Sequence, residues 1–124
     1  MIVVFDSGIW VSAMEFGGTP FEAVIRAIAQ DRFAVCDLEE EVVRVLTHKF
    51  GWVRADLANY WLDALRVELE GTVTGICRDP KDEPILECAE RAEAERIVTG
   101  DHDLLSLASY RGIRIMTARD YVST

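Results

Sequence analysis

The sequence has few basic residues. Its 13 Lys and Arg stand against 22 Asp and Glu, which gives a formal net charge of −9 over 124 residues. Taken alone, this balance argues against broad binding of a phosphate backbone, because such binding needs basic residues that displace counterions. It allows a basic partner protein, or an acidic pocket filled by cations. An acidic surface that only keeps the protein in solution is the commonest alternative.

Long hydrophobic runs are also missing. No apolar segment approaches the ~20 residues needed to span a membrane, and the chain does not open with the basic and apolar regions of a secretory signal. We therefore expect a cytoplasmic protein with no membrane partner. The three cysteines lie in no CxxC pair, so neither a disulfide framework nor a zinc site is expected.

The apolar residues that are present indicate an α/β fold. Residues 1–5 are too uniformly apolar for a half-exposed strand and are typical of a strand buried on both faces, in a parallel sheet covered by helices. Further strands at 32–36, 96–99 and 113–116 alternate with helical patterns, which predicts βαβ units. We expect a single domain over residues 1–124, a three-layer α/β/α sandwich with a central, mostly parallel sheet.

The predicted helices follow from apolar spacing and from capping residues. Thr19 as N-cap, with Pro20 and Glu22 after it, indicates a helix start with a capping box. Asp37 is expected to cap a second helix that runs to about residue 49. The first of these helices is expected to bury a face made of Phe21, Val24, Ile25 and Ile28. The remaining predicted elements are helices at 9–14, 55–69, 85–92 and 104–108, and a short irregular strand within 71–77.

Acidic residues stand where the predicted strands end. Asp6 directly follows the first strand, and Asp101 and Asp103 follow the strand at 96–99, across Gly100. Asp82 stands near the start of a predicted helix. In open parallel sheets ligands bind outside the carboxyl ends of the strands, so these acids are candidates for one site.

Carboxylates that gather at such an edge suit a hard divalent cation. Mg²⁺ prefers oxygen ligands and keeps several waters, so a few carboxylates are enough to hold it. Without a cation, neighbouring carboxylates repel and raise the pKa of one another. With one, the cluster can activate water for in-line displacement at a phosphodiester.

Each acid also has a purely structural interpretation, and spacing alone does not decide between the two. Asp6 can cap the turn that follows it, and Asp82 can be only an N-cap. Asp101 and Asp103 can be ordinary turn acids. Glu41 can be a solvated residue in the first turn of its helix.

The sequence holds four acidic motifs in order, at residues 2–13 (IVVFDSGIWVSA), 41–46 (EVVRVL), 79–89 and 98–105. This ordered set resembles the PIN-domain family and, within it, the VapC-like toxins of toxin–antitoxin modules. Residues 2–13 look like the family's opening strand and its Asp-Thr-Asn type motif. Residues 41–46, EVVRVL, are similar to its Glu motif, and residues 79–89 and 98–105 to its third and fourth acidic motifs. Residues 113–121 follow its usual ending. No single motif is specific, but the ordered set is.

The resemblance implies a ribonuclease that depends on Mg²⁺ or Mn²⁺ and hydrolyses RNA phosphodiesters. Its catalytic and metal-site carboxylates would be Asp6, Glu41, Asp82 and Asp101. Ser7 and Asp103 would support them. The resemblance also implies RNA as substrate, a cognate antitoxin protein as partner, and a homodimer.

One position departs from the family's pattern. The third residue of the first motif is commonly Asn, and here it is Gly8, which has no side chain to hydrogen-bond a water. An alternative hypothesis is therefore a catalytically weakened PIN-like binding module, which binds a partner protein or RNA without turnover. A phosphoacceptor receiver domain is disfavoured, because Asp6 stands alone and Met116-Thr117, not a Lys, follows the last strand.

Overall fold

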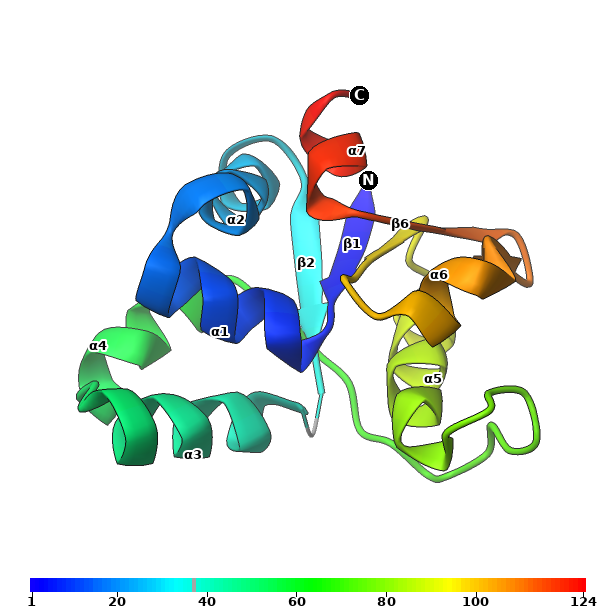
Figure 1. Cartoon of the computed structure of the whole chain (residues 1–124), viewed down its shortest axis with the longest axis horizontal. Coiled ribbons are helices and arrows are strands. Elements are labelled where there is room, and N and C mark those ends of the chain that lie inside the picture. Colours follow the sequence, from blue (N-terminus) through cyan, green and yellow to red (C-terminus); the bar gives the residue numbers. More distant parts are fainter. Residues whose placement is uncertain (37) are drawn as a thin grey trace.

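A central sheet with helices on both faces forms the body of the molecule (Figure 1). The computed structural model describes residues 1–36 and 38–124, without the side chains of 38 and 39. In chain order the elements are β1 (Ile2–Phe5), α1 (Ser7–Phe16), α2 (Gly18–Gln30), β2 (Arg32–Val35), α3 (Leu38–Phe50), α4 (Arg54–Ala58), η1 (Asn59–Trp61), β3 (Leu65–Arg66), η2 (Pro80–Asp82), α5 (Glu83–Arg91), β4 (Arg96–Val98), α6 (His102–Leu107), β5 (Ser109–Tyr110), β6 (Ile113–Met116) and α7 (Ala118–Val122). None of the helices in the described part of the chain is long and apolar enough to cross a membrane.

Over the described residues the sheet has six strands in the order β3-β2-β1-β4-β6-β5. All the neighbouring pairs are parallel except β5 with β6. Val4 of β1 lies opposite Ala34 of β2 on one side and Ile97 of β4 on the other. The chain moves from β1 to β2 in one direction and later returns to β4 on the other side of β1. The strand order therefore reverses beside β1, and ligands bind at such switch points.

Neighbouring residues of β1 enter two different cores. Val3 and Phe5 pack with α1, α2, α3 and α7, whereas Val4 packs with α5 and α6 on the opposite face. All three side chains are at most 2% exposed. In Figure 1, α1 to α4 lie on one side of β1 and β2, and α5 and α6 lie on the other. The predicted α/β/α sandwich with a mostly parallel sheet is confirmed.

The helix predicted over residues 55–69 is wrong. α4 ends at Ala58, the 3₁₀ turn η1 follows, and β3 then pairs in parallel with β2. Trp61 is buried as expected, but Leu62, its neighbour, is 75% exposed. The apolar residues that suggested a continuous helix therefore lie in separate elements, for example Trp61 in η1 and Leu65 in β3. The pairing covers backbone groups that β2 would otherwise leave at an open sheet edge.

The short strand predicted within residues 71–77 is also wrong, since these residues, all of them described, form no strand. Four of their backbone N–H groups donate instead to two carboxylates of α5, those of Glu83 and Glu87. Conversely, the two-residue strand β5 was not predicted. Two residues are too few to show an alternation of apolar and polar side chains.

The predicted start of α2 is wrong in its details. The helix begins at Gly18, its N-cap is Gly17, and no side chain caps it. Thr19 is therefore not the N-cap, and it forms no capping box with Glu22. The predicted N-cap of α3, Asp37, lies outside the described residues.

The buried face of α2 also differs from the prediction. Ile25 and Ile28 are 41% and 42% exposed. The buried residues are Ala23, Val24 and Ala27. Two alanines on this face allow a close approach of α2 to α1 and α7, which are its main neighbours.

Candidate functional site

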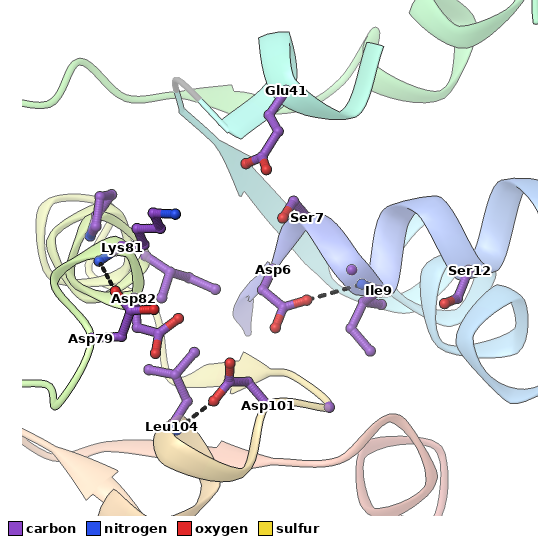
Figure 2. A pocket seen from close by; sticks show the side chains of 14 residues that line it. Asp6, Ser7, Ile9, Ser12, Glu41, Asp79, Lys81, Asp82, Asp101 and Leu104 are labelled. Carbon is purple, nitrogen blue, oxygen red and sulfur yellow. Dashed lines mark hydrogen bonds between the residues drawn. The ribbon is translucent and has the colours of Figure 1, made fainter. Parts of the chain in front are cut away.

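An open pocket of about 730 Å³ lies at the carboxyl ends of β1 and β4, next to the switch point of the sheet. Five carboxylates line it, one of them that of Asp79, and the other four come from different segments of the chain. These four are Asp6, Glu41, Asp82 and Asp101, and Figure 2 shows them directed into the same space. The structure thus brings together in one pocket the four acids that the sequence marked as candidates.

Asp6 connects the end of β1 to the start of α1. Its backbone N–H donates to the carbonyl of Val98 at 3.2 Å, next to the pairing of β1 with β4. Oδ1 accepts from the backbone N–H of Ile9 at 2.9 Å, so Asp6 caps α1. Oδ2 accepts from the hydroxyl of Thr99. Asp6 therefore caps α1, as its structural interpretation predicted, and it also lines the pocket.

Asp101 has an equivalent place at the start of α6. Its Oδ1 accepts from the backbone N–H groups of Asp103 at 2.7 Å and Leu104 at 3.2 Å. Both capping bonds use the same oxygen, and Figure 2 shows the other oxygen directed into the pocket. The backbone N–H of Asp101 donates to the hydroxyl oxygen of Thr99 at 3.0 Å. One threonine therefore contacts both acids.

Three carboxylates lie close enough to hold one cation. An oxygen of Asp82, one of Asp101 and one of Asp103 lie within 4.8 Å of one another. Asp82 occupies the N-cap position of α5, but its side chain makes no capping hydrogen bond. Helix capping therefore does not explain where its carboxylate points. Asp103, expected only in a supporting role, belongs to this group, while Asp6 and Glu41 line the pocket outside it.

Glu41 reaches the pocket from α3, and Ser7 from the first position of α1. The Glu41 side chain is exposed, as a solvated residue would also be. Its direction is more informative: in Figure 2 the carboxylate points toward Ser7 and Asp6 rather than away from the pocket. Both side chains therefore line the pocket that holds the other candidate acids.

The surroundings of Asp6 disfavour its charged form. Burial raises the pKa of Asp6 above its ordinary value of 3.8, and the nearby charge of Asp101 raises it further. The hydrogen bonds from Thr99 and Ile9 act in the opposite direction, because they favour the carboxylate. The net direction is upward.

The pKa of Asp82 is also raised, but by a different combination of causes. Burial is the largest cause of its raised pKa, followed by the charges of Asp101, Asp79 and Asp103. Like charges at short range disfavour ionisation unless a cation lies between them. The donor set also consists of carboxylate oxygens, the ligands preferred by Mg²⁺ and Mn²⁺. The residues present therefore fit a divalent metal ion.

Thr99 was not predicted to be a residue of the site. Its side chain is fully buried, and it is one of three buried polar residues among those described. Its hydroxyl donates to Asp6 and accepts from Asp101, which ties the ends of β1 and β4 together. A signal was present, since a threonine that ends a buried strand directly before Gly-Asp must find a partner for its hydroxyl.

Glu87, a buried acid of α5, was missed as well. It is 2% exposed. Its carboxylate accepts from the backbone N–H groups of Glu70 at 2.6 Å, Gly71 at 2.8 Å and Thr72 at 3.0 Å. The bond from Glu70 is the largest cause of a lowered pKa for Glu87, and Arg91 adds to it through a contact at 2.8 Å.

Glu83, one turn earlier on α5, holds the next part of the same loop. It is 7% exposed and accepts from the backbone N–H groups of Ile76 at 2.7 Å and Cys77 at 3.2 Å. The two glutamates therefore fix residues 70–77 against α5. This segment leads directly to Asp79 and Asp82, so the position of the pocket wall depends on it.

An α/β/α sandwich with a carboxylate cluster at the switch point of its sheet is the architecture in which a metal-dependent hydrolase site is expected. A family model described as PIN domain matches residues 2–103. The chain therefore belongs to the PIN-domain family, whose members are generally nucleases and typically use divalent metals. No match is found among curated proteins or among solved structures.

Proposed function

We propose that this protein is an endoribonuclease that depends on Mg²⁺ or Mn²⁺ and hydrolyses RNA phosphodiesters. The observation that carries the proposal is the group formed by Asp82, Asp101 and Asp103, whose oxygens lie within 4.8 Å of one another. Asp6 and Glu41 add two more carboxylates to the same pocket. Several like charges at short range destabilise the site unless a cation lies between them. Membership of the PIN-domain family suggests that such a cation takes part in nuclease activity.

The metal would be held by Asp82, Asp101 and Asp103, with Asp6 and Glu41 facing it from the other walls of the pocket. When bound, a divalent cation stabilises charge on phosphoryl oxygens and lowers the pKa of water. Asp103 is thereby added to the predicted ligand set, and Glu41 takes a more peripheral place in it.

The other residues of the pocket act on the substrate and its protons. Asp6 is suited to accept a proton from an attacking water, because its raised pKa makes it a stronger base than an ordinary aspartate. Ser7 and Lys81 line the pocket and supply a hydroxyl and an ammonium group to the phosphate. Thr99 holds Asp6 and Asp101 in register but does not face the substrate.

We further propose that the protein is the toxin of a toxin–antitoxin pair, acting in the cytoplasm as a homodimer. The support is the resemblance of the ordered motifs to VapC-like toxins. The net charge of −9 suits an antitoxin whose arginine side chains pair with the carboxylates of the pocket. The partner would then inhibit the enzyme by occupying the place of the metal ion and the RNA.

The experiment that tests the nuclease is the cleavage of a mixed RNA pool in Mg²⁺, in Mn²⁺ and in EDTA. The wild type is compared with Asp6→Asn and Asp101→Asn. We expect cleavage that requires metal and falls by at least about 100-fold in both variants. Cleavage that survives both substitutions would assign the activity to another site or to a contaminant.

A second candidate function is a PIN-like module that binds RNA or a partner protein without turnover. Gly8 favours it, because this residue lines the pocket and offers no side chain there. The module predicts that a folded wild type binds Mn²⁺, measured by calorimetry, yet cleaves no RNA. The nuclease predicts both binding and cleavage.

A further inference from the structure

A second open pocket, of about 490 Å³, lies on the exposed side of α3 next to the acidic pocket. Its lining residues are Glu40, Glu41, Arg44, Thr47, His48 and Arg54. Glu41 lines both pockets, so the two surfaces meet at this side chain. Figure 1 shows α3 on the outside of its helical layer, where a long ligand can reach it.

The side chains along this face of α3 change from acidic to basic. Glu41, Arg44 and His48 are spaced three and four residues apart, so they follow one another on the same helix face. The distance from residue 41 to residue 48 is about 10 Å along the helix axis. A ligand that leaves the acidic pocket over Glu41 therefore meets Arg44 first and His48 next.

The cations of this surface are available for a ligand. Within the described part of the chain, the side chains of Arg44 and His48 form no hydrogen bond or ion pair. Arg54 approaches Glu40 at 3.8 Å, with the two side chains 67% and 79% exposed. Such an exposed pair contributes little and is easily exchanged for another anion.

Three other arginines of the chain contact the protein itself. Arg26 donates to two backbone carbonyls, Arg91 contacts two glutamates, and Arg111 contacts Glu90 at 2.7 Å. Arg44 and His48 are cations beside the acidic pocket in a chain with a net charge of −9. RNA is repelled by that overall charge, so local cations beside the acidic pocket are where its backbone can bind.

We infer that Arg44, His48 and Arg54 form a phosphate-binding surface that holds the RNA backbone next to the acidic pocket. The inference rests on the proposed nuclease function and adds the surface that binds its substrate. Arg44 is the central contact, because it lies nearest to Glu41 along α3.

The test measures RNA binding without cleavage. A short fluorescein-labelled single-stranded RNA is titrated with protein in EDTA, and its fluorescence anisotropy is followed over a series of salt concentrations. The variants are Arg44→Ala and Arg44→Lys. Arg32→Ala is the matched control, because it removes the same charge from an exposed residue at the start of β2, at the opposite end of the sheet from the pocket. Alanine favours a helix, so the Arg44 variant is expected to fold.

We expect Arg44→Ala to weaken RNA binding by about 3–10-fold and to lower the salt slope by about 0.7, the loss of one phosphate contact on a single strand. Arg44→Lys should keep most of the affinity, and Arg32→Ala should match the wild type. Equal weakening in Arg44→Ala and Arg32→Ala, or no RNA binding by the wild type, would overturn the inference. The assay uses no metal and does not depend on cleavage. An absence of catalysis would therefore count against the proposed nuclease and not against the inferred RNA-binding surface.

Discussion

Thr99 and Asp6 are joined by a hydrogen bond between the carboxyl ends of two neighbouring strands. The same hydroxyl group accepts the backbone N–H of Asp101 at 3.0 Å. Because Thr99 is fully buried, water cannot take over either bond. The relative position of two acids of the pocket therefore depends on one hydroxyl.

Replacing Thr99 with valine keeps the shape of the side chain and removes both bonds. We expect metal affinity or RNA cleavage to fall by about 10–100-fold, as for other partners that orient metal ligands. The free energy of unfolding should fall by about 1–3 kcal/mol, because buried groups lose their partners. Thr99→Ser restores the hydroxyl and should recover most of the activity in the same assay. A fully active Thr99→Val variant would show that the bond does not position Asp6.

The geometry indicates that Asp103 is a metal ligand and that Glu41 is not. Asp103 belongs to the group of oxygens within 4.8 Å of one another, and Glu41 does not. Calorimetric titration with Mn²⁺ should therefore show affinity reduced by about 10-fold or more in Asp103→Asn, with a much smaller loss in Glu41→Gln. The opposite order would return Glu41 to the ligand set and make Asp103 a turn acid.

The pH dependence of the stability of the metal-free protein should reveal the repulsion between Asp82 and the neighbouring acids. Its pKa is raised above 3.8 by burial and by neighbouring acids. The folded state then holds this proton more tightly than the unfolded state, so stability falls as pH rises from about 3.8 through the folded pKa. Asp82→Asn removes this loss. In EDTA the variant should unfold at a higher temperature than the wild type at pH 7, and the difference should disappear at pH 3. A variant that is less stable at neutral pH would contradict this.

Glu87 should show the opposite dependence on pH. Its pKa is lowered from 4.5, first by the backbone N–H of Glu70. Its contribution to stability is therefore fully present above pH 4.5 and is lost as the pH falls through the lower folded pKa. Glu87→Gln should lower the melting temperature at pH 7, and the gap to the wild type should narrow in acid.

The matched control for Glu87 is Glu90→Gln on the same helix. Glu90 forms an ion pair with Arg111, in which the side chains are 37% and 68% exposed, and it also accepts from the hydroxyl of Tyr110 at 3.2 Å, a bond that glutamine can keep. Such pairs contribute little, so this control should melt close to the wild type. Equal melting temperatures for the two variants would remove the role assigned to Glu87 in holding residues 70–77.

Gly8 can be tested by restoring the residue that the family commonly has. A Cβ at position 8 would meet Oδ1 of Asp6 at 3.4 Å, an ordinary contact, and the backbone there is not left-handed. Gly8→Asn should therefore fold and place an amide at the pocket. If the missing side chain limits turnover, RNA cleavage should rise several-fold in Gly8→Asn and not in Gly8→Ala. Equal rates in both variants would show that Gly8 does not weaken the enzyme.

Much of the fold could be predicted because its signals are local. The apolar run at 1–5 cannot be solvated on either face, so it required a covered, parallel sheet. Apolar spacing placed α2, α3 and α5 close to their observed bounds, although the predicted N-cap of α2 was wrong. Asp6 and Asp101 could be marked as candidates for a similar reason, since each follows the end of a buried strand.

Other features depended on contacts that the local sequence does not contain. Residues 65–66 became a strand because the edge of β2 was open to them, although their spacing favoured a helix. Ile25 stayed partly exposed because α1 and α7 approach the alanines of α2.

The layered α/β architecture and the order of the acids along the chain could be predicted from local sequence patterns. Which carboxylates share a site depends on the tertiary structure. Asp82 comes within 4.8 Å of Asp101 and Asp103 because Glu83 and Glu87 anchor the preceding loop to α5. Asp6 joins the pocket because β1 pairs with β4 and Thr99 bridges their ends. The contact between Thr99 and Asp6 links residues 93 positions apart in the chain, and only the folded backbone brings them together.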